Sequence, residues 1–523
     1  MTEKATKKRV LIADTTLRDG AQTIGVQFTP EAKMRVIEHL ISLGIDIIEV
    51  GTPIASPQEF DVAKTAAEKF ADAPVILSAF ARAKEIDIQH AWDAIGSHPN
   101  GMLAMLTSVS DVHIESKFKS DRATMLEYFK KMVLYAKEVG FKKILIYLED
   151  GTRAEPSYVI ELVRTFVELD CDIISIPDTV GFVNSPKKYG EIYSTLYKEI
   201  DIPEKTVLSS HTHNDKGLAV ANALAAIEGG AKMVEGTING IGERAGNASL
   251  GAILLNLYSD DAGNWASEDY QIETNINLAQ YAKTAQLVGD LCGIGINSNE
   301  PLVGKSVCTT AAGIHQDGVI KNKKTYFCFE PEKFGVSTEN KLLSFNMLSG
   351  LKGIIQALDE MGLSFEKEQY EKIYEQVILL AQQKEPSRDD IKAIALDISE
   401  DKDLHVELLY CRASSGIVPC SAEVVLKKTG EDQRLRGIGF GDGPFAAFID
   451  ICSDLLEIDV VIQNYHDSVV GKGRESQMQT YIECTIMGET YNGRGVSTDI
   501  VQAGCRAFMK CVNRYFRMKE GSV

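Results

Sequence analysis

Short apolar runs alternate with amphipathic stretches from residue 10 to about residue 255. Eight runs have the length and the Val, Ile and Leu content of buried strands: residues 10–14, 45–51, 75–80, 102–107, 143–149, 173–177, 206–210 and 233–237. The stretches between them place apolar residues at helical spacing: 30–43, 58–70, 84–94, 121–139, 156–169, 186–198 and 218–228. Strands that alternate with helices in this way predict a parallel sheet with crossover helices.

The number of these elements favours one α/β fold. Eight strand–helix repeats over ~250 residues match the size of a (β/α)8 barrel, the TIM barrel. A doubly wound open sheet is the alternative, but it more often has about five to seven strands. Active sites of TIM barrels lie at the carboxyl ends of the strands. Polar residues do follow the predicted strands, and they include Arg18-Asp19, Glu149, Asp178 and His211.

His211 and His213 are the strongest candidates for metal binding. Residues i and i+2 of a strand point to the same face, so both imidazoles can reach one point. Asp19, at another strand end, can add a carboxylate. Two histidines and a carboxylate with open positions suit a divalent metal that also holds substrate. The alternative is a polar strand end with solvated histidines, which the second motif around Asp19 disfavours.

The chain changes character after the barrel. Residues 270–293 have a helical pattern, and residues 309–323 form a turn-rich segment. Further helices are expected over residues 348–361, 365–384 and 387–397, before a charged boundary at 400–403. From residue 405 the pattern predicts two similar βββα units with Gly-rich turns: 406–411, 422–427, 436–440 and helix 443–456, then 460–465, 479–487, 491–496 and helix 499–515.

These patterns divide the chain into three predicted domains. Residues 1–290 form a TIM barrel with the candidate site, residues 291–403 form mostly helical linker subdomains, and residues 404–523 form an α+β domain. The repeat suggests a pseudo-symmetric binding module in the last part.

Composition adds mainly exclusions. The formal net charge of −19 argues against nucleic acid as a main partner. We expect no membrane partner, because no apolar run approaches the ~18–20 residues of a membrane span. The ten cysteines are scattered without a CxxC motif. Reduced, mostly buried thiols and a polar N-terminus without a secretory signal predict a cytoplasmic protein.

Five motifs together resemble the DRE-TIM metallolyase superfamily, and within it the 2-isopropylmalate, citramalate and homocitrate synthases. They are Asp14–Gly20 (DTTLRDG), the YLED run that contains Glu149, PDTVG at 177–181, HTHND at 211–215 and GERAGN at 242–247. The resemblance covers nearly the whole chain, because the C-terminal repeat is similar to the amino-acid-sensing domain of the first two enzymes.

The resemblance implies that acetyl-CoA and a 2-oxo acid give a 2-hydroxy diacid and CoA. It implies that Asp19, His211, His213 and Asn247 hold a divalent metal, which the residue types leave open as Mn²⁺, Mg²⁺ or Zn²⁺. Arg18 would stabilise the alkoxide that forms on attack. Thr179 resembles the residue that binds the oxo-acid carboxylate. Glu149 resembles one that contacts the substrate near the metal, and its alternative role is pairing with a nearby Arg.

A general base must still remove a proton from the acetyl methyl group. Metal-bound histidines cannot serve, so His315 is the candidate, with Asp317 to orient it and Tyr326 nearby in sequence. In the similar enzymes this segment lies over the barrel of a partner subunit. The resemblance therefore implies a homodimer with composite active sites.

Specificity residues favour pyruvate, and hence a citramalate synthase. Tyr147 lies two residues before Glu149 and faces the same side of its strand; similar isopropylmalate synthases carry a small residue there. Leu106 resembles the leucine that closes a pyruvate pocket, and Ala104 offers nothing to the distal carboxylate of a homocitrate precursor. Ala21 and Gly151 depart from the Glu and Trp of similar enzymes, and both put the exact oxo acid in doubt.

Other functions remain open at this point. 2-Isopropylmalate synthase, acting on 2-oxoisovalerate, is the main alternative; homocitrate synthase and a carbon–carbon lyase of the same superfamily rank lower. A non-enzymatic amino-acid sensor would require lost metal ligands, and none is missing. The resemblance also implies a branched-chain amino acid as effector: isoleucine for a citramalate synthase, leucine for an isopropylmalate synthase.

Overall fold

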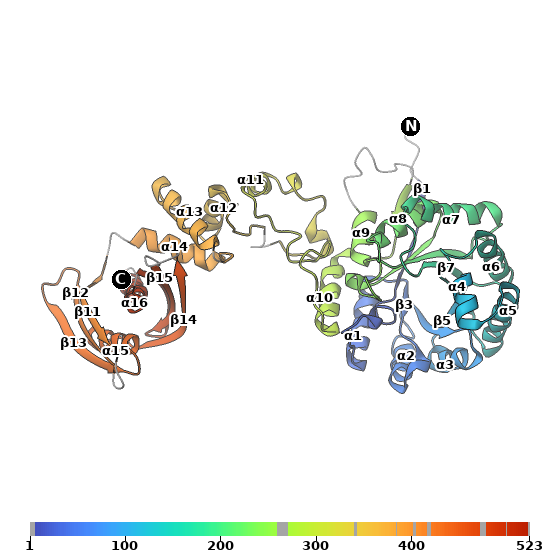
Figure 1. The fold of residues 1–523 in the computed structure, drawn as a ribbon, viewed down its shortest axis with the longest axis horizontal. Helices are drawn as coiled ribbons and strands as arrows, with labels where there is room; N and C mark the ends of the chain where they lie inside the picture. Colours follow the sequence, from blue (N-terminus) through green and yellow to red (C-terminus); the bar gives the residue numbers. More distant parts are fainter. Residues whose placement is uncertain are drawn as a thin grey trace. The chain divides into compact units, whose positions relative to one another are not determined.

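A computed structural model describes residues 6–258, 270–338, 342–382, 384–400, 404–415, 420–470, 477–497 and 499–520. Eight parallel strands close into a barrel, as the sequence pattern predicts. The strands are β2 (Leu11–Asp14), β3 (Ile47–Glu49), β4 (Ile76–Arg82), β5 (Gly101–Ser108), β6 (Lys143–Glu149), β7 (Ile173–Asp178), β8 (Val207–Thr212) and β9 (Met233–Gly236). Figure 1 shows them enclosed by helices.

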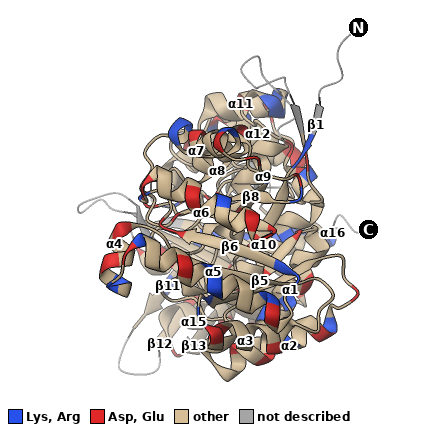
Figure 2. Cartoon of the chain, turned by 90° about the vertical axis from the view of Figure 1, so that its right-hand side faces the viewer, with Lys and Arg blue, Asp and Glu red and all other residues tan. Residues whose placement is uncertain are grey.

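The surrounding helices are α1 (Pro30–Leu43), α2 (Pro57–Lys69), α3 (Glu85–Ile95), α5 (Arg122–Val139), α6 (Pro156–Glu168), α7 (Pro186–Glu199), α8 (Ala219–Gly229) and α9 (Leu250–Leu257). A short helix α4 (Asp111–His113) and a π-helical turn (Ile114–Phe118) precede α5. Lys, Arg, Asp and Glu are interspersed on α2, α3 and α5 (Figure 2), while the inward faces of the helices are apolar.

Local chemistry sets the ends of α1. The Thr29 hydroxyl accepts a hydrogen bond from the Ala32 amide at 3.1 Å, and Pro30 occupies the first helical position. Gly44 ends the helix at φ +86°, where a Cβ would lie 2.2 Å from the Asn275 carbonyl oxygen. Only glycine therefore allows this turn.

Side chains in register fill the barrel in layers. Tyr147 pairs with Ser175, and Ser175 pairs with Ser209, across β6, β7 and β8. The apolar interior consists of Ala13, Ile47, Met102, Ala104, Leu145, Tyr147, Ile173 and Met233. Because residues i and i+2 share a face, the strands that carry this core also direct polar residues toward the mouth.

Two segments after the barrel differ from the expectation. Residues 270–293 were expected to be helical throughout. Their first part is instead a strand, β10 (Tyr270–Glu273), that pairs in parallel with β1 (Thr6–Arg9). Only α10 (Tyr281–Cys292) is helical in the second part, besides a 3₁₀ turn before it. The backbone of the Tyr-Gln-Ile-Glu run forms its hydrogen bonds with a strand near the N-terminus. Local periodicity does not reveal such a distant partner.

The segment around His315 is not a turn-rich loop but the helix α11 (Gly313–Lys321). Helices α12 (Leu351–Glu360), α13 (Lys367–Ala381) and α14 (Arg388–Glu400) follow close to their predicted ranges. The predicted boundary at 400–403 lies largely outside the described residues, since 401–403 are not described.

Two βββα units form the C-terminal part, as predicted. The first contains β11 (Val406–Ser414), β12 (Cys420–Lys428), β13 (Arg434–Gly441) and α15 (Pro444–Leu456); the second contains β14 (Val460–Val470), β15 (Gln477–Ile486), β16 (Glu489–Ser497) and α16 (Ile500–Glu520). Each unit forms an antiparallel sheet.

Gly-rich turns are expected at residues 437–443 and 493–495, but most of the glycines in these segments lie inside strands. Gly437 and Gly439 belong to β13, and Gly493 and Gly495 belong to β16. A Cβ on Gly495 would lie 1.9 Å from the Ala503 carbonyl oxygen of α16. The glycines therefore let each helix pack directly on its sheet. The expectation of a Gly-rich turn is wrong for these four glycines, which lie in the predicted strands 436–440 and 491–496, whereas Gly443 does lie in the turn before α15.

The chain divides into two compact units. One contains residues 1–309 and 327–341, and the other contains residues 310–326 and 342–523. Eight of the ten cysteines are buried, and Cys328 is exposed. Among the described residues, no helix is both long and apolar enough to cross a membrane.

Candidate metal centre and active site

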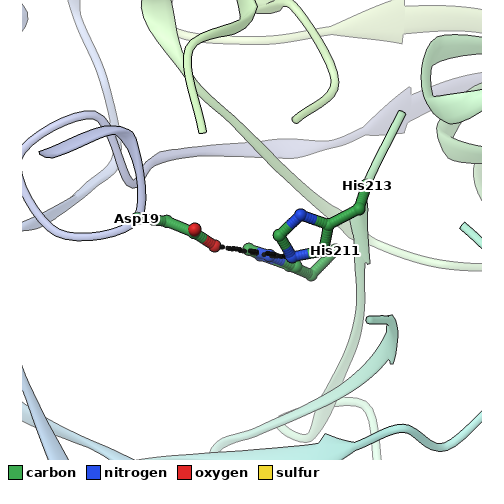
Figure 3. A group of neighbouring side chains, drawn as sticks. All are labelled: Asp19, His211 and His213. Carbon is green, nitrogen blue, oxygen red and sulfur yellow. Dashed lines mark hydrogen bonds and ion pairs between the residues drawn. The ribbon is translucent and has the colours of Figure 1, made fainter. Parts of the chain in front are cut away.

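Asp19, His211 and His213 converge at the carboxyl end of the barrel (Figure 3). The strand β8 continues through Thr212, so His211 is a strand residue and His213 follows directly after it. The two Nε2 atoms are 3.3 Å apart, and Asp19 Oδ2 lies 3.0 Å from His211 Nε2 and 3.7 Å from His213 Nε2. One ligand atom from each residue lies within 4.8 Å of the others. The predicted convergence is therefore present.

The three side chains are buried, and their charges are strongly coupled. Burial disfavours the Asp19 carboxylate, but Arg18 and His211 outweigh it and hold the pKa of Asp19 well below its usual range. Burial also opposes protonation of His211, yet hydrogen bonds to Asp19 and Glu235 raise the pKa of His211 to about 9. Burial and the charge of His211 lower the pKa of His213 to about 3. Without metal the cluster thus holds an ionised Asp19, a protonated His211 and a neutral His213, and a divalent cation that binds His211 would release its proton.

Asn247, which the family resemblance adds to the expected ligands, lies next to His213. Its backbone forms an antiparallel bridge with His213, and its side chain is 2% exposed. The side-chain atoms Oδ1 and Nδ2 of Asn247 have no hydrogen-bond partner among the described residues, and the same is true of His213 Nδ1. A Cβ on Gly242 would lie 2.1 Å from Asn247 Oδ1, so any larger residue at position 242 would have to displace the Asn247 side chain. Buried polar atoms are rarely left unpaired; these residues therefore fit a metal ion.

Arg18 is held between two acidic groups and two aromatic rings. Its Nε donates to Glu49 Oε2 at 2.7 Å, and its Nη1 lies 3.1 Å from Asp19 Oδ2. The guanidinium carbon lies 4.7 Å from the centre of the Phe80 ring and 5.6 Å from that of Tyr147. This arrangement fixes one positive charge beside the metal cluster.

Glu49 and Glu235 are functional candidates that the sequence analysis missed. Both are charged residues inside short apolar strands, and this contrast is the signal that would have found them. Glu235 Oε2 accepts from the Tyr147 hydroxyl at 2.7 Å and lies 3.2 Å from His211 Nδ1. Carboxylates that bond the outer nitrogen of a metal-ligating histidine orient it.

A cavity of about 400 Å³ opens over the cluster. Four residues expected to contact substrate, besides Arg18, line it: Leu106, Tyr147, Glu149 and Thr179. Phe80, Arg82 and Arg244 line it too, although the sequence analysis assigned them no role. The structure thus gathers the predicted substrate residues around one space.

Neighbours restrain Glu149 and Thr179. Glu149 accepts from Ser108 and from Lys117, whose Nζ lies 2.9 Å from Oε1, and it also faces His113. Its recorded partners are thus Lys and His, not the Arg considered as an alternative. The Thr179 hydroxyl accepts from the Asp150 amide at 2.9 Å.

His315 and Tyr326 contact each other within the second unit. Their ring centres are 4.1 Å apart on the exposed side of α11 and the turn after it. Asp317, expected to orient His315, instead accepts from Lys321 at 2.6 Å and from Lys352 at 2.7 Å. On a helix, residues i and i+2 do not face each other, which explains the difference.

Family models match the chain in three successive segments. An HMGL-like model matches residues 9–288, a "homocitrate synthase post-HMGL domain-like" model matches residues 302–385, and a LeuA allosteric (dimerisation) domain matches residues 385–516. A 2-isopropylmalate synthase of Oceanobacillus iheyensis is 33% identical over 98% of both chains. One from Heliobacterium modesticaldum is 34% identical over 97% of both. The HMG-CoA lyase structure from Bacillus subtilis, 21% identical, covers 57% of this chain and 98% of its own, with a TM-score of 0.46.

The closed barrel and its Asp-His-His cluster thus define a divalent-metal-dependent enzyme of the HMGL-like barrel class. The chain belongs to the HMGL-like (DRE-TIM) family, in the branch of 2-isopropylmalate and citramalate synthases that carries a LeuA domain. It is accordingly an acyltransferase that condenses acetyl-CoA with a 2-oxo acid. The LeuA match also favours a synthase over a lyase.

Proposed function

We propose that this protein condenses acetyl-CoA with 2-oxoisovalerate and releases 2-isopropylmalate and CoA. The Asp19–His211–His213 cluster beside Arg18, inside the 400 Å³ cavity, is the observation that carries the proposal. Curated relatives of equal length that are named 2-isopropylmalate synthase support this choice of oxo acid. It replaces pyruvate, which the sequence favoured, as the leading substrate.

The cluster residues would hold the metal, with Asn247 as a further ligand. A divalent metal supplies a Lewis acid that polarises a carbonyl group. Arg18, fixed by Glu49, presents a positive charge where the alkoxide oxygen develops. Thr179 and Glu149 would orient the oxo acid through its carboxylate and its neighbouring atoms.

The condensation needs a base for the acetyl methyl group. His315 takes that proton in this proposal, with Tyr326 against its ring. A carbon–carbon bond then forms between the methyl carbon and the keto carbon, the former keto oxygen takes up a proton to become the hydroxyl group, and water cleaves the thioester to release CoA. His315 belongs to the second unit of the chain, and we propose that a partner subunit supplies it in a homodimer.

Pyruvate remains a second candidate because of one observation. The Tyr147 ring lies edge-on to His211, with ring centres 5.8 Å apart, and its hydroxyl is anchored on Glu235. Tyr147 and Leu106 both line the cavity, and a bulky ring in its wall leaves less room for a branched side chain of the oxo acid. A methyl group needs less room than an isopropyl group there.

The C-terminal domain supports a proposal of feedback control. Its match to a LeuA allosteric (dimerisation) domain suggests a branched-chain amino acid as effector. Leucine is the expected effector if the product is 2-isopropylmalate, and isoleucine if it is citramalate.

CoA thiol release from the full chain tests the proposal, with Mn²⁺ and 2-oxoisovalerate present. Asp19→Asn should abolish turnover, because it removes a ligand charge from the cluster. Asp61→Asn is the matched control, because Asp61 is an exposed residue on the outer helix α2. Equal turnover in both variants would overturn the metal-centred proposal.

A cavity variant decides between the two oxo acids. Each extra methyl group that a pocket accommodates contributes ~1–3 kcal/mol of discrimination. Wild-type kcat/KM should therefore favour 2-oxoisovalerate over pyruvate by at least about 30-fold. If the wild type prefers pyruvate and Tyr147→Val shifts the preference to 2-oxoisovalerate, pyruvate is the substrate.

A further inference from the structure

One carboxylate inside the barrel joins four consecutive strands. Glu235, on β9, is 1% exposed. Its Oε1 accepts from Ser175 Oγ on β7 at 2.6 Å and from Ser209 Oγ on β8 at 2.8 Å. Its Oε2 accepts from the Tyr147 hydroxyl on β6 and faces His211 Nδ1 on β8. The two carboxylate oxygens thus have different partners. Oε1 contacts only the two serines, whereas Oε2 contacts His211 of the metal cluster and Tyr147 of the cavity wall.

The hydrogen bond at Nδ1 determines which ring nitrogen of His211 is available to bind a metal. Without metal, Nε2 lies 3.0 Å from Asp19 Oδ2 and donates its proton to it, while Nδ1 donates to Glu235. When a metal displaces the Nε2 proton, the proton on Nδ1 stays with Glu235 and the lone pair of Nε2 is free for the metal. Which ring nitrogen binds a metal is set by the hydrogen bond that the other one makes. Glu235 therefore selects the tautomer that the cluster requires.

The same oxygen also fixes the Tyr147 ring. The hydroxyl bond of 2.7 Å holds this ring edge-on to the His211 imidazole, and the ring forms part of the cavity wall. A single oxygen atom thus ties a proposed metal ligand to a residue that limits the size of the substrate.

We propose that Glu235 is a positioning residue that orients His211 for the metal and Tyr147 for the substrate. It does not touch the reacting atoms, and it acts through these two side chains. Four hydrogen-bond donors stabilise the negative charge of Glu235, which allows a carboxylate to be buried inside the barrel. The inference rests on the metal-dependent reaction proposed above.

Calorimetric titration of the full-length, metal-stripped chain with Mn²⁺ tests the inference, with no substrate present. Glu235→Gln keeps the shape of the side chain but removes its charge. Loss of a carboxylate behind a metal-binding histidine typically weakens metal binding about 10–100-fold. We expect the Kd for Mn²⁺ to rise by that factor, while the melting temperature of the metal-free chain stays close to that of the wild type.

Ser175→Ala is the matched control, because it removes one hydrogen bond from the oxygen that faces away from His211. Its Kd for Mn²⁺ should stay within about threefold of wild type, well inside the range expected for Glu235→Gln. Equal weakening in both variants would mean a general loosening of the barrel interior and would overturn the inference. Unchanged Mn²⁺ binding by folded Glu235→Gln would overturn it too.

A second measurement does not require any variant at Glu235 to fold. In the Zn²⁺-loaded wild type with ¹⁵N-labelled histidine, the His211 signals, assigned with a His211→Asn variant, should show Nδ1 protonated and Nε2 bound to metal. Coordination through Nδ1 would contradict the inference. Neither readout depends on the oxo acid, so a wrong substrate assignment in the proposed function would leave both results unchanged.

Discussion

Removal of the Arg18 guanidinium should destabilise the barrel mainly through Glu49. The Arg18 side chain is 10% exposed and the Glu49 side chain 3% exposed, at a separation of 2.7 Å. Asp19 keeps His211 as a neighbour, whereas Glu49 Oε1 already lacks a hydrogen-bond partner among the described residues. Removing one partner of a buried pair costs about 3–5 kcal/mol. Arg18→Met should therefore lower the melting temperature of the barrel by about 6–10 °C, at roughly 2 °C per kcal/mol for a domain of this size.

The destabilisation by Arg18→Met should increase with pH. Burial raises the pKa of Glu49, and Arg18 opposes this rise. Without Arg18 the folded-state pKa rises further above the unfolded value, so the stability lost through Glu49 grows as the pH increases. The difference in melting temperature between wild type and Arg18→Met should be larger at pH 8 than at pH 5.5.

Differential scanning calorimetry of four full-length chains measures this effect: wild type, Arg18→Met, Glu49→Gln and the double variant. Glu49→Gln in the Arg18→Met background removes the unpaired charge and should restore more than half of the lost stability. All chains that lack Arg18 should remain inactive, because the alkoxide loses its donor. A melting temperature of Arg18→Met within 2 °C of wild type, or no recovery in the double variant, would refute the reasoning.

Three further predictions concern other parts of the molecule. Burial raises the pKa of Asp14 from 3.8 to about 7, so the stability from its neutral form should be lost as the pH rises between these values. Relative to Asp14→Asn, the wild type should lose about 3 kcal/mol of stability from pH 4 to pH 7 in thermal melts. A pH-independent difference would show that Asp14 stays ionised. His315→Ala should lower the rate of CoA release by about 10²–10⁴-fold, with oxo-acid binding retained. Mixing His315→Ala chains with Arg18→Met chains should restore activity. No recovery in confirmed heterodimers would place each active site within one chain. Calorimetry of the intact chain should detect leucine binding. Leucine should also inhibit the enzyme, with a coupling free energy of ~1–3 kcal/mol between leucine binding and substrate binding. An enzyme that binds neither leucine nor isoleucine would have a purely structural C-terminal domain.

Periodicity was sufficient to predict the barrel and the C-terminal repeat. Each barrel strand is followed by its own helix, so the pattern repeats locally and does not depend on distant partners. The strand β10 was missed because its partner β1 lies more than 250 residues away in sequence. The glycines of β13 and β16 fall in the predicted strands, but they also suggest turns, because close helix packing, which requires glycine too, leaves no mark in a single sequence.

The convergence of Asp19, His211 and His213 was predictable for a similar reason. Strand ends of a parallel barrel meet at one mouth, so their polar residues come together without detailed packing information. Glu235 was not found, because its role depends on hydroxyl donors that three other strands, β6, β7 and β8, bring to it across the barrel interior. Asp317 was wrongly placed beside His315, because its segment is a helix and not a loop.

Product analysis of an internal competition tests the central claim most directly. The full-length chain is incubated with acetyl-CoA, Mn²⁺ and equal concentrations of 2-oxoisovalerate and pyruvate, and both products are quantified by mass spectrometry. The product ratio equals the ratio of the two kcat/KM values. We expect 2-isopropylmalate to exceed citramalate by at least about 30-fold, with neither product formed by Asp19→Asn. An excess of citramalate would contradict the proposed substrate, and unchanged synthesis by Asp19→Asn would contradict the metal centre itself.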